Sequence, residues 1–343
     1  MKMRILELYS GIGGMHYALK ESGVPGEIIA AIEINTIANS VYKHNHPSTN
    51  VLNKNIEALN LDDIKELNID TILMSPPCQP FTRVGLQKDK ADARTNSLFQ
   101  VLEIIKNLSN LNYIILENVV GFEKSETRDF VIKAINDSFN YKELILSPCQ
   151  FGVPNSRRRY YLLAKRKGLK FIFNDSSLVD NIPQQIQEIL PRKFTNDMTL
   201  KDFISLDDLS DENMYLIPEN TLEKRFNVLD IRSPDSKGSC CFTKAYPTYA
   251  EGTGSVYSPL SSDTVKKITK DLKIHNDKSN DNMELIKTLK LRYFSPKQVS
   301  QLMCFPDDFT FPNDITKKQK YRLLGNSINV HVVSQLIYLL NQQ

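Results

Sequence analysis

The sequence RILELYSGIGG, residues 4–14, decides the fold. Residues 4–9 predict a strand, residues 10–14 form a glycine loop, and residues 15–22 predict a helix. Glycines allow the backbone to turn sharply and to approach a ligand, and the N-terminus of the following helix offers free amide groups. The stretch therefore predicts a strand–loop–helix unit that holds a ligand at its loop.

An acidic residue stands where a nucleotide-binding unit needs one. A second predicted strand, residues 27–32, is followed by Glu33, about 20 residues after the glycine loop, where an acid meets ribose hydroxyls in such units. Nicotinamide, flavin and S-adenosylmethionine sites share these two features, so they predict a nucleotide-like cofactor without choosing among the three. The alternative is a simple tight turn followed by a solvated acid.

The same alternation continues through the first half of the chain. Further strands are predicted at 71–74, 113–116, 142–146 and 159–164, and further helices at 36–45, 97–108 and 127–139. Strands alternating with helices predict an α/β fold, a Rossmann-like, mostly parallel sheet with helices on both faces. The last two strands are too close together for an intervening helix, so one strand pair is expected to be antiparallel.

The alternation ends near residue 165. Residues 165–290 mix short apolar patches with Pro, Asn, Asp and Ser clusters, which is typical of a second, irregular domain. Regular signals return at Ser295-Pro296, an N-cap followed by proline, and at an apolar-periodic helix over 330–340. We therefore divide the chain into residues 1–164, 165–290 and 291–343.

Composition limits the class of protein. The 343 residues are 41% hydrophobic and 24% charged, with a net charge of only +3, so bulk charge does not indicate nucleic-acid binding. The five cysteines show no C-x-x-C spacing, which argues against a zinc site or a disulfide framework and for a reducing compartment. No apolar run approaches the roughly 18 residues of a membrane span, so we expect an intracellular protein without one.

Two reactive side chains follow predicted strands. Cys78 stands just beyond the strand 71–74, after two prolines that end strand pairing, and Glu117 follows the strand 113–116. The carboxyl ends of parallel strands form one edge, so we expect these groups to share a cleft. A thiolate is a good nucleophile and leaving group, and a carboxyl beside it suits proton donation to a ring nitrogen. The alternatives are a small buried thiol and an exposed acid.

Seven basic residues and no acid lie between positions 157 and 170. In a strand, Arg157 and Arg159 share one face while Arg158 points the other way. This run is either a solvated edge, a set of phosphate contacts, or a pair of guanidinium groups that supports Glu117. The polar segment 82–96 is expected to be a mobile active-site loop.

Together these residues resemble the cytosine-5 methyltransferase family. Four of its signature motifs occur in the family's order: Pro76-Pro77-Cys78-Gln79, Glu117-Asn118-Val119, Arg157-x-Arg159 and Gly325-Asn326-Ser327. The resemblance covers about 1–165 and 291–343. It implies a class I S-adenosylmethionine-dependent catalytic domain over 1–164, a target-recognition domain over 165–290, and a C-terminal segment that returns to the catalytic domain.

Within that family the chain resembles a eukaryotic branch, formerly called the second DNA methyltransferase. Members of this branch methylate cytosine 38 in the anticodon loop of tRNA-Asp. Its marks here are Cys241-Phe242-Thr243, the segment 251–255 (EGTGS) and Met74-Ser75. The resemblance thus implies tRNA, above all tRNA-Asp, as the partner, with weak action on DNA, and a monomer without membrane contact in cytoplasm and nucleus.

The resemblance also implies a mechanism. Cys78 adds to carbon 6 of a flipped-out cytosine while Glu117 engages ring nitrogen 3, and carbon 5 then accepts the methyl group from S-adenosylmethionine. Arg157 and Arg159 would steady the base and Glu117. No metal is implied. The cofactor would contact Gly11, Ile12, Gly13, Gly14, Glu33, Ile34, Ile56, Ser75, Asn326 and Ser327.

Two departures and three rival functions remain open. Asn55-Ile56 stands where the family often has an aspartate for adenine, and Cys240 beside Cys241 is either a pair of buried thiols or places Cys241 near the active site. A DNA cytosine-5 methyltransferase would use the same machinery. A non-catalytic tRNA-binding protein would not need Cys78, and a nicotinamide oxidoreductase would give Cys78 no role.

Overall fold

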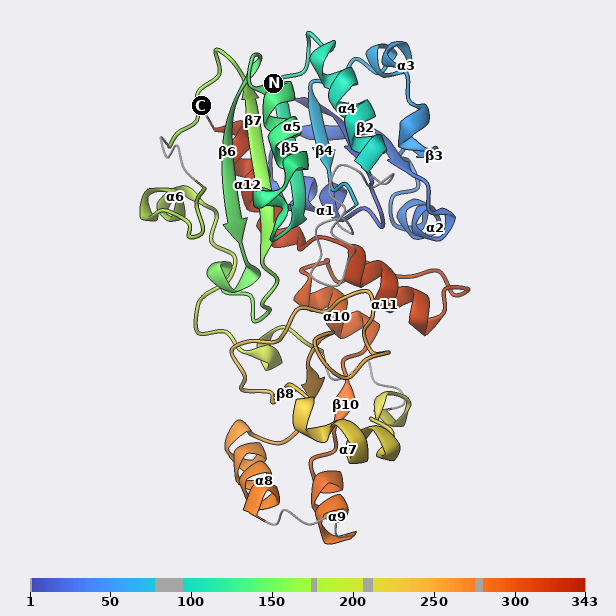
Figure 1. Ribbon diagram of the computed structural model, residues 1–343, viewed down its shortest axis with the longest axis vertical. Coiled ribbons are helices and arrows are strands. Elements are labelled where there is room, and N and C mark those ends of the chain that lie inside the picture. The colour runs from blue at the N-terminus through green and yellow to red at the C-terminus, as the bar shows by residue number, and fades with distance from the viewer. Residues whose placement is uncertain (1, 78–94, 174–177, 206–211, 275–279, 343) are drawn as a thin grey trace.

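The computed structural model describes residues 2–77, 95–173, 178–205, 212–274 and 280–342. Two lobes are stacked along the long axis of the molecule (Figure 1). The upper lobe contains a large sheet flanked by helices, and the lower lobe contains short strands and the helices α7, α8 and α9.

Among these residues the upper sheet has seven strands, in the order β3-β2-β1-β4-β5-β7-β6. Their bounds are β1 Met3–Leu8, β2 Gly26–Glu33, β3 Val51–Asn53, β4 Thr71–Met74, β5 Tyr113–Val119, β6 Phe139–Leu146 and β7 Arg159–Arg166. The first five are mutually parallel, and β7 runs antiparallel to both β5 and β6. The expected antiparallel pairing is confirmed: only a short 3-10 turn, Pro148–Phe151, lies between β6 and β7, and it is too short to carry the chain back for a parallel strand.

Helices cover both faces of this sheet (Figure 1). They are α1 Gly14–Ser22, α2 Thr36–Asn45, α3 Leu61–Glu66, α4 Asn96–Lys106, α5 Glu126–Ile135 and α12 Val330–Asn341. Successive strand residues belong to opposite cores, as the strand period of two requires. In β4, for example, Leu73 packs with α1 and α12, whereas Ile72 and Met74 pack with α4. The α/β class with a mostly parallel sheet is thereby confirmed.

The last helix completes the layer that the first helix begins. α12 packs against α1 and β7, so the two ends of the chain share one face of the sheet. By length and composition alone, Lys317–Asn341 could cross a membrane, but 78% of its most apolar window is buried within the structure. This stretch is two helices, α11 Lys317–Asn326 and α12, and it forms part of the core.

The lower lobe is smaller and less regular. A three-stranded sheet joins β8 Ile231–Arg232, β9 Val256–Tyr257 and β10 Arg292–Tyr293, and the surrounding helices are α7 Glu219–Arg225, α8 Ser262–Ile274 and α9 Asn280–Thr288. The helices α6 Gln184–Ile189 and α10 Pro296–Leu302 lie outside this lobe. Ile186 of α6 and Val299 of α10 belong to the large core of the upper lobe, and β7 extends two residues past position 164.

Several element boundaries differ from the sequence-based prediction, and two of them matter for the site and the sheet. Glu117 lies inside β5, paired with Tyr161, rather than beyond the end of the strand. The helix α5 ends at Ile135 instead of 139, because Phe139 already pairs with Arg166 in the sheet. The pairing partners, which the local sequence does not reveal, set both boundaries.

Candidate functional site

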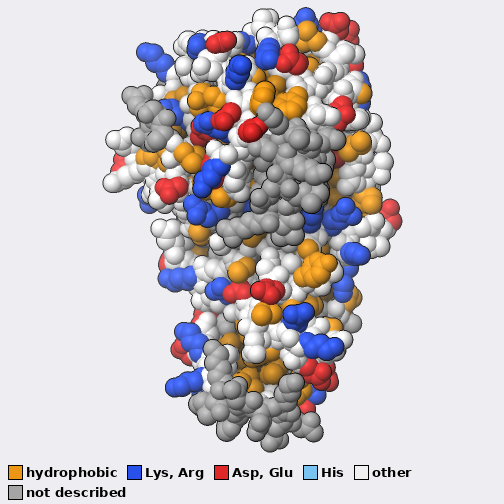
Figure 2. All heavy atoms as spheres, in the orientation of Figure 1, with side chains coloured by type: hydrophobic (Ala, Val, Ile, Leu, Met, Phe, Trp, Pro, Cys, Tyr) orange, Lys and Arg blue, Asp and Glu red, His pale blue; other side chains and the backbone are white. Residues whose placement is uncertain are grey.

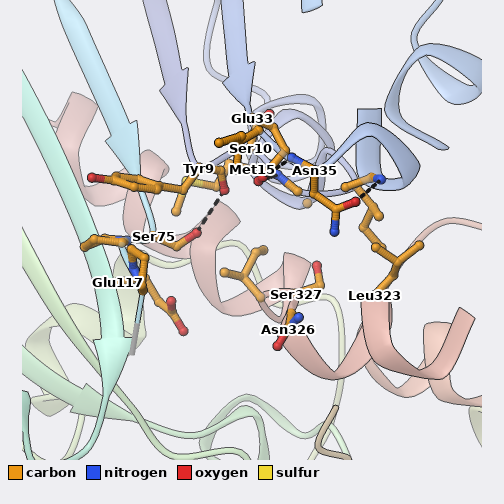
Figure 3. Close-up of a pocket in the computed structure, with 18 of the residues that line it drawn as sticks. Tyr9, Ser10, Met15, Glu33, Asn35, Ser75, Glu117, Leu323, Asn326 and Ser327 are labelled. Atoms are coloured by element: carbon orange, nitrogen blue, oxygen red, sulfur yellow. Dashed lines mark hydrogen bonds between the residues drawn. The ribbon is translucent and has the colours of Figure 1, made fainter. Parts of the chain in front are cut away.

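A cavity of about 580 Å³ opens at the carboxyl ends of β1, β2, β4 and β5. Ligands bind at this edge in open α/β sheets, and the volume lies within the usual range for small-molecule sites. Figure 3 shows Glu33, Ser75, Glu117 and Asn326 around it. The lining also includes Lys244 from the loop between β8 and β9, so the cavity is assembled from distant parts of the chain.

The glycine loop forms the floor of the cavity. Gly11 and Gly13 have φ values of 54° and 83°, a region that favours glycine. A Cβ on Gly14 would stand 2.8 Å from Cγ1 of Ile328, which makes a side chain there too large. Among the described residues no side chain caps the start of α1 at Gly13, and an uncapped helix N-terminus suits a ligand carboxylate.

Glu33 is held in place at the rim by backbone amides. Its Oε2 accepts a hydrogen bond from the amide of Gly11 at 3.1 Å, and its Oε1 accepts one from the amide of Asn35 at 2.9 Å. The side chain of Asn35 in turn caps α2. A carboxylate fixed in this way has remaining acceptor capacity for two hydroxyl groups, as a ribose presents.

Two isoleucines flank the place expected for a flat ring. Ile34 is 63% exposed and Ile56 is buried, and both line the cavity. The side chain of Asn55 accepts from the amide of Glu57 at 3.1 Å, so it caps the short turn after β3. Because the oxygen of this side chain is already engaged, apolar contact is the main interaction we expect for an adenine here.

Glu117 marks the other end of the cavity. Its carboxyl is 7% exposed, and its Oε1 lies 3.3 Å from Nε of Arg159. Burial raises the pKa of Glu117 above its ordinary value, and the nearby Arg159 and Arg157 reduce this rise without cancelling it. A carboxyl that protonates readily and faces a cavity is suited to donate a proton to a ring nitrogen.

Arg157 joins three distant segments rather than binding solvent. It is 2% exposed, and its guanidinium donates to the carbonyl oxygens of Phe242 at 3.1 Å, Gly325 at 3.2 Å and Ser327. Arg158 is exposed, so the predicted division of faces is confirmed. The first residues of β7 are thereby fixed against the lower lobe and α11.

Cys241 belongs to the same cluster. Its Sγ lies 3.4 Å from Nη1 of Arg157 and 3.9 Å from Nη2 of Arg159. Burial would raise the pKa of this thiol, but the two guanidinium groups outweigh burial and lower it. Of the two interpretations of the cysteine pair, the structure favours a site residue for Cys241. Cys240 lies near Asp230, where burial raises its pKa.

The predicted nucleophile lies outside the described residues. Cys78 and residues 82–94 of the expected loop belong to this segment, and the chain is described up to Pro77. Pro76 and Pro77 line the cavity next to Glu117 and Arg159. The other predicted residues that line it are Gly11, Ile12, Gly14, Ser75, Asn326 and Ser327.

The prediction of phosphate contacts in the second half of the basic run is wrong for Lys165 and Arg166. Lys165 is fully buried and donates to the carbonyl oxygens of Lys170, at 2.9 Å, and Gln342. Arg166 donates to the carbonyls of Leu108 and Leu111. Six residues of strand, roughly 20 Å, separate Lys165 from Arg159. Lys165 thus holds the C-terminal end of the chain, and Arg166 holds the connection between α4 and β5, both at the opposite edge of the sheet.

Sequence reasoning missed Glu7, Lys244 and Arg322, all of which line the cavity. A carboxylate among apolar strand residues was an available signal for Glu7, because a buried charge needs a reason. Lys244 and Arg322 carry no comparable local signal, because the meeting of the lobes brings them to the cavity. Across the described ranges, no group of three or more His, Cys, Asp or Glu side chains is placed to hold a metal ion.

Comparisons with known proteins agree with this geometry. The family model described as C-5 cytosine-specific DNA methylase matches residues 3–341. A Spodoptera frugiperda protein named tRNA (cytosine(38)-C(5))-methyltransferase is 48% identical, and a human protein of the same name is 42% identical. These alignments cover 99% and 98% of this chain, respectively, and 99% of each relative.

Solved structures give the same picture. A mutant form of Spodoptera frugiperda DNMT2 superposes with a TM-score of 0.88 at 47% identity, covering 99% of this chain and all of that one. S. pombe Dnmt2 superposes with a TM-score of 0.81 at 34% identity, covering 99% of this chain and 98% of that one. The resemblance stated from the motifs is confirmed, and the chain belongs to the C-5 cytosine-specific DNA methylase family.

Proposed function

We propose that this enzyme transfers a methyl group from S-adenosylmethionine to carbon 5 of cytosine 38 in the anticodon loop of tRNA-Asp. One observation carries the proposal most directly. A buried carboxyl with a raised pKa, Glu117, lies beside Arg159 at one end of a cavity whose other end has the glycine loop and Glu33. The relatives named for this reaction align with the chain over nearly its whole length.

The residues present fit S-adenosylmethionine, the cofactor that the family uses. The glycine loop leaves no room for a Cβ at Gly14, and a buried oxygen of Glu7 lacks a partner among the described residues. In the proposed arrangement, the glycine loop, residues 11–14, holds the methionine end of the cofactor, and Glu33 binds the ribose. Ile34 and Ile56 contact the adenine. Ser75, Asn326 and Ser327 complete the wall. The bound cofactor supplies an electrophilic methyl group.

The protein's own groups activate the base. The thiolate of Cys78 forms a bond to carbon 6, and Glu117 donates a proton to nitrogen 3, so the displaced electrons make carbon 5 nucleophilic. Once carbon 5 carried the methyl group, its proton would leave to water, the bond to Cys78 would break, and the proton on nitrogen 3 would return to Glu117, which restores the aromatic ring. Arg159 keeps Glu117 in position, and Arg157 keeps Arg159's strand in position.

Local charge at the cavity supports an RNA substrate. Lys244 and Arg322 line the cavity, and α11 carries four basic residues and no acid: Lys317, Lys318, Lys320 and Arg322. On the face in Figure 2, Lys and Arg side chains recur along both margins of the molecule, mixed with acidic ones. A local basic strip near the site suits phosphate contacts better than a uniformly charged surface would.

The cost of exposing the base also favours RNA. The target must leave its stack to reach Glu117, which costs a few kcal/mol in duplex DNA. Bases in a tRNA loop are already partly unstacked, so the cost is lower. Tyr249, five residues after Lys244, is 65% exposed, and an exposed aromatic ring is the kind of surface on which an unstacked base stacks.

DNA is the second candidate substrate. A Dictyostelium discoideum relative, 39% identical over 99% of this chain, is named a DNA (cytosine-5)-methyltransferase.

The test is methyl transfer from labelled S-adenosylmethionine to total tRNA and to duplex DNA in parallel, with Cys78→Ala as the control. We expect label in tRNA alone, at a single position, and none with Cys78→Ala. Label only in DNA would show that DNA, and not tRNA, is the substrate. Label in neither would refute the proposal that the protein is an active methyltransferase.

The RNA surface has a separate test. Lys244→Ala and Arg322→Ala should weaken tRNA binding and reduce its salt dependence, because each removes a phosphate contact. Lys167→Ala, at the opposite edge of the sheet, is the matched control and should leave the salt dependence unchanged. Equal salt slopes in all four proteins would show that α11 and Lys244 do not contact the phosphates.

A further inference from the structure

A second cavity, of about 190 Å³, lies between α6, the segment 190–196 and the first turns of α12. Its lining shares no residue with the lining of the cofactor cavity. Sites for drug-sized molecules measure roughly 300–1,000 Å³, so this cavity suits a single ring system. The methyl transfer proposed above makes no use of it, and it is therefore a separate candidate site.

One face of the mostly apolar helix α12 carries three buried polar side chains. They are His331, Ser334 and Gln335, the last two lying three and four residues after the first. Glu21 serves two of them, because its Oε1 accepts from the hydroxyl of Ser334 at 3.2 Å and pairs with Nδ1 of His331. Gln335 is 4% exposed, and its Oε1 has no hydrogen-bond partner within the described ranges. A buried acceptor without a donor is costly, and because Gln335 lines the cavity, this points to a ligand that supplies the donor.

The inner walls of the cavity are aromatic and apolar. The rings of Phe151 and Phe194 both contact the ring of His331, with centroids 5.9 Å and 4.8 Å from it. Ile182 and Leu190, which are buried, also line the cavity. A flat heteroaromatic ring can pack against such walls and direct an N–H group in its own plane toward the amide of Gln335.

The mouth of the cavity is positively charged. Arg192 and Lys193 are exposed there, and the lining contains no acidic residue from the described part of the chain. Lys193 already pairs with Glu21 at 2.9 Å, whereas no ion pair of Arg192 occurs among the described residues. A guanidinium group binds phosphate through two parallel hydrogen bonds. Arg192 is therefore suited to hold an anionic group attached to the ring.

We propose that this cavity binds a nucleoside monophosphate, with the base inside against Gln335 and the phosphate at the mouth beside Arg192. A glutamine amide pairs with the edge of a base through two hydrogen bonds, as it does with adenine. Phe151 packs against the base, and the exposed position of Arg192 leaves the phosphate partly in water. The inference stands apart from the proposed function, because none of these three residues takes part in methyl transfer.

Calorimetric titration of the full-length protein with AMP and with UMP tests this assignment. S-adenosylhomocysteine is present at saturation, so that the cofactor cavity is closed to an adenosine group. We expect one of the two nucleotides to bind at least about tenfold more tightly than adenosine, uridine or inorganic phosphate, because the base and the phosphate each contribute contacts. Inorganic phosphate binding as tightly as the nucleotides would refute a site for the base.

Gln335→Met separates a role in binding from a role in the fold. Methionine is similar in length to glutamine and brings no unpaired acceptor, so the melting temperature of the free protein should stay the same or rise. Affinity for the nucleotide should fall about tenfold, because the base loses its polar partner. A lower melting temperature with unchanged affinity would show that Oε1 of Gln335 serves the fold alone and would refute the proposal.

Arg192→Ala tests the phosphate contact. Nucleotide binding should weaken about three- to tenfold, more at low salt than at high salt, while nucleoside binding stays the same. Arg225→Ala, which removes an exposed arginine of α7 in the lower lobe, is the matched control and should bind as the wild type does.

Three outcomes would overturn the assignment and leave the proposed function intact. The first is that neither AMP nor UMP binds at millimolar concentration. The second is that binding occurs only when S-adenosylhomocysteine is omitted, which would place the nucleotide in the cofactor cavity. The third is equal nucleotide affinity in the wild type and Arg192→Ala, which would show that the phosphate does not contact Arg192.

Discussion

The two ends of the cavity are built in different ways. The cofactor end is built mostly from residues 7–57 and Ser75, which fold as successive strands, loops and helices, and residues 326–328 add one wall. The base end brings together Glu117, Arg157, Cys241 and the carbonyls of 325–327, which come from four separated segments. One end is held by backbone hydrogen bonds, and the other by guanidinium groups shared among lobes.

This difference teaches which changes should stay local. A substitution at the cofactor end alters contacts within one strand–loop–helix unit, whereas one at the base end affects the junction of both lobes. Cofactor affinity and chemical rate should therefore respond to different residues, and protein stability should depend more on the base end.

The largest effect is expected from Glu117→Gln. The amide cannot donate a proton as an acid, so methyl transfer to tRNA should fall by roughly 10²- to 10⁴-fold, the usual worth of general acid catalysis. Affinity for S-adenosylhomocysteine should stay within about twofold of wild type, a change of less than 0.5 kcal/mol. Single-turnover rates and calorimetry measure the two. A comparable loss of affinity for S-adenosylhomocysteine would show that the two ends of the cavity do not act independently.

Gly325→Ala tests the junction of the lobes. A Cβ there would stand 2.2 Å from the backbone nitrogen of Lys244 and the carbonyl carbon of Thr243, and backbone cannot move aside as a side chain can. We expect a loss of about 1–3 kcal/mol in the free energy of unfolding, from overpacking. Gly238→Ala, with nothing within 4 Å, is the matched control and should change little. Equal denaturant midpoints for Gly325→Ala and the wild type would show that the backbone at 243–244 moves to accept the added methyl group at little cost.

Glu33→Gln probes the cofactor end alone. Its amide nitrogen would face the backbone donors of Gly11 or Asn35, and the charged acceptor would be lost. S-adenosylhomocysteine should bind about tenfold more weakly, or about 1.4 kcal/mol, while tRNA binding is unchanged. Glu27→Gln, exposed near the start of the same strand, is the control. Weaker tRNA binding in Glu33→Gln would show that the two ends are coupled.

Cys241→Ser should give the smallest change and a specific pH signature. If Cys241 is ionised, its charge partly neutralises Arg157 and Arg159, and its loss lets them lower the pKa of Glu117 further. Glu117 acts in its protonated form, so activity is lost as the pH rises through its pKa. With a lower pKa, this loss should begin at a lower pH than in the wild type. At neutral pH the rate should change only about two- to threefold, or about 0.5 kcal/mol. Cys240→Ser should keep the wild-type profile of kcat/KM against pH.

The fold was largely predictable because its signals are local. The bounds of β4 and α2 agree with the periodicity of the sequence, and the N-cap and proline at 295–296 begin α10 as predicted. The glycine loop and Glu33 were predictable for the same reason, since short spacings along the chain determine their geometry. The roles of the cofactor residues remain predictions until a bound cofactor is observed.

The base end was less predictable because distant partners define it. Arg157 and Lys165 belong to the same basic run, yet one ties the lobes together near Glu117 and the other fixes Gln342 at the far edge. Nothing in the local sequence distinguishes a solvated cation from a buried one. Cys241 belongs to the site because the fold brings it beside Arg157, a contact that the local sequence does not predict.

The contact between Gly14 and Ile328 has a consequence for synthesis of the protein. The glycine loop leaves the ribosome early, but the residue against which it packs is made 314 positions later (328 minus 14). At roughly 5–20 residues per second, this interval is roughly 15 to 60 s. Throughout it a nascent chain carries the loop and Glu33 without the wall formed by 326–328. A ribosome-bound fragment therefore lacks a complete cofactor cavity until the end of translation.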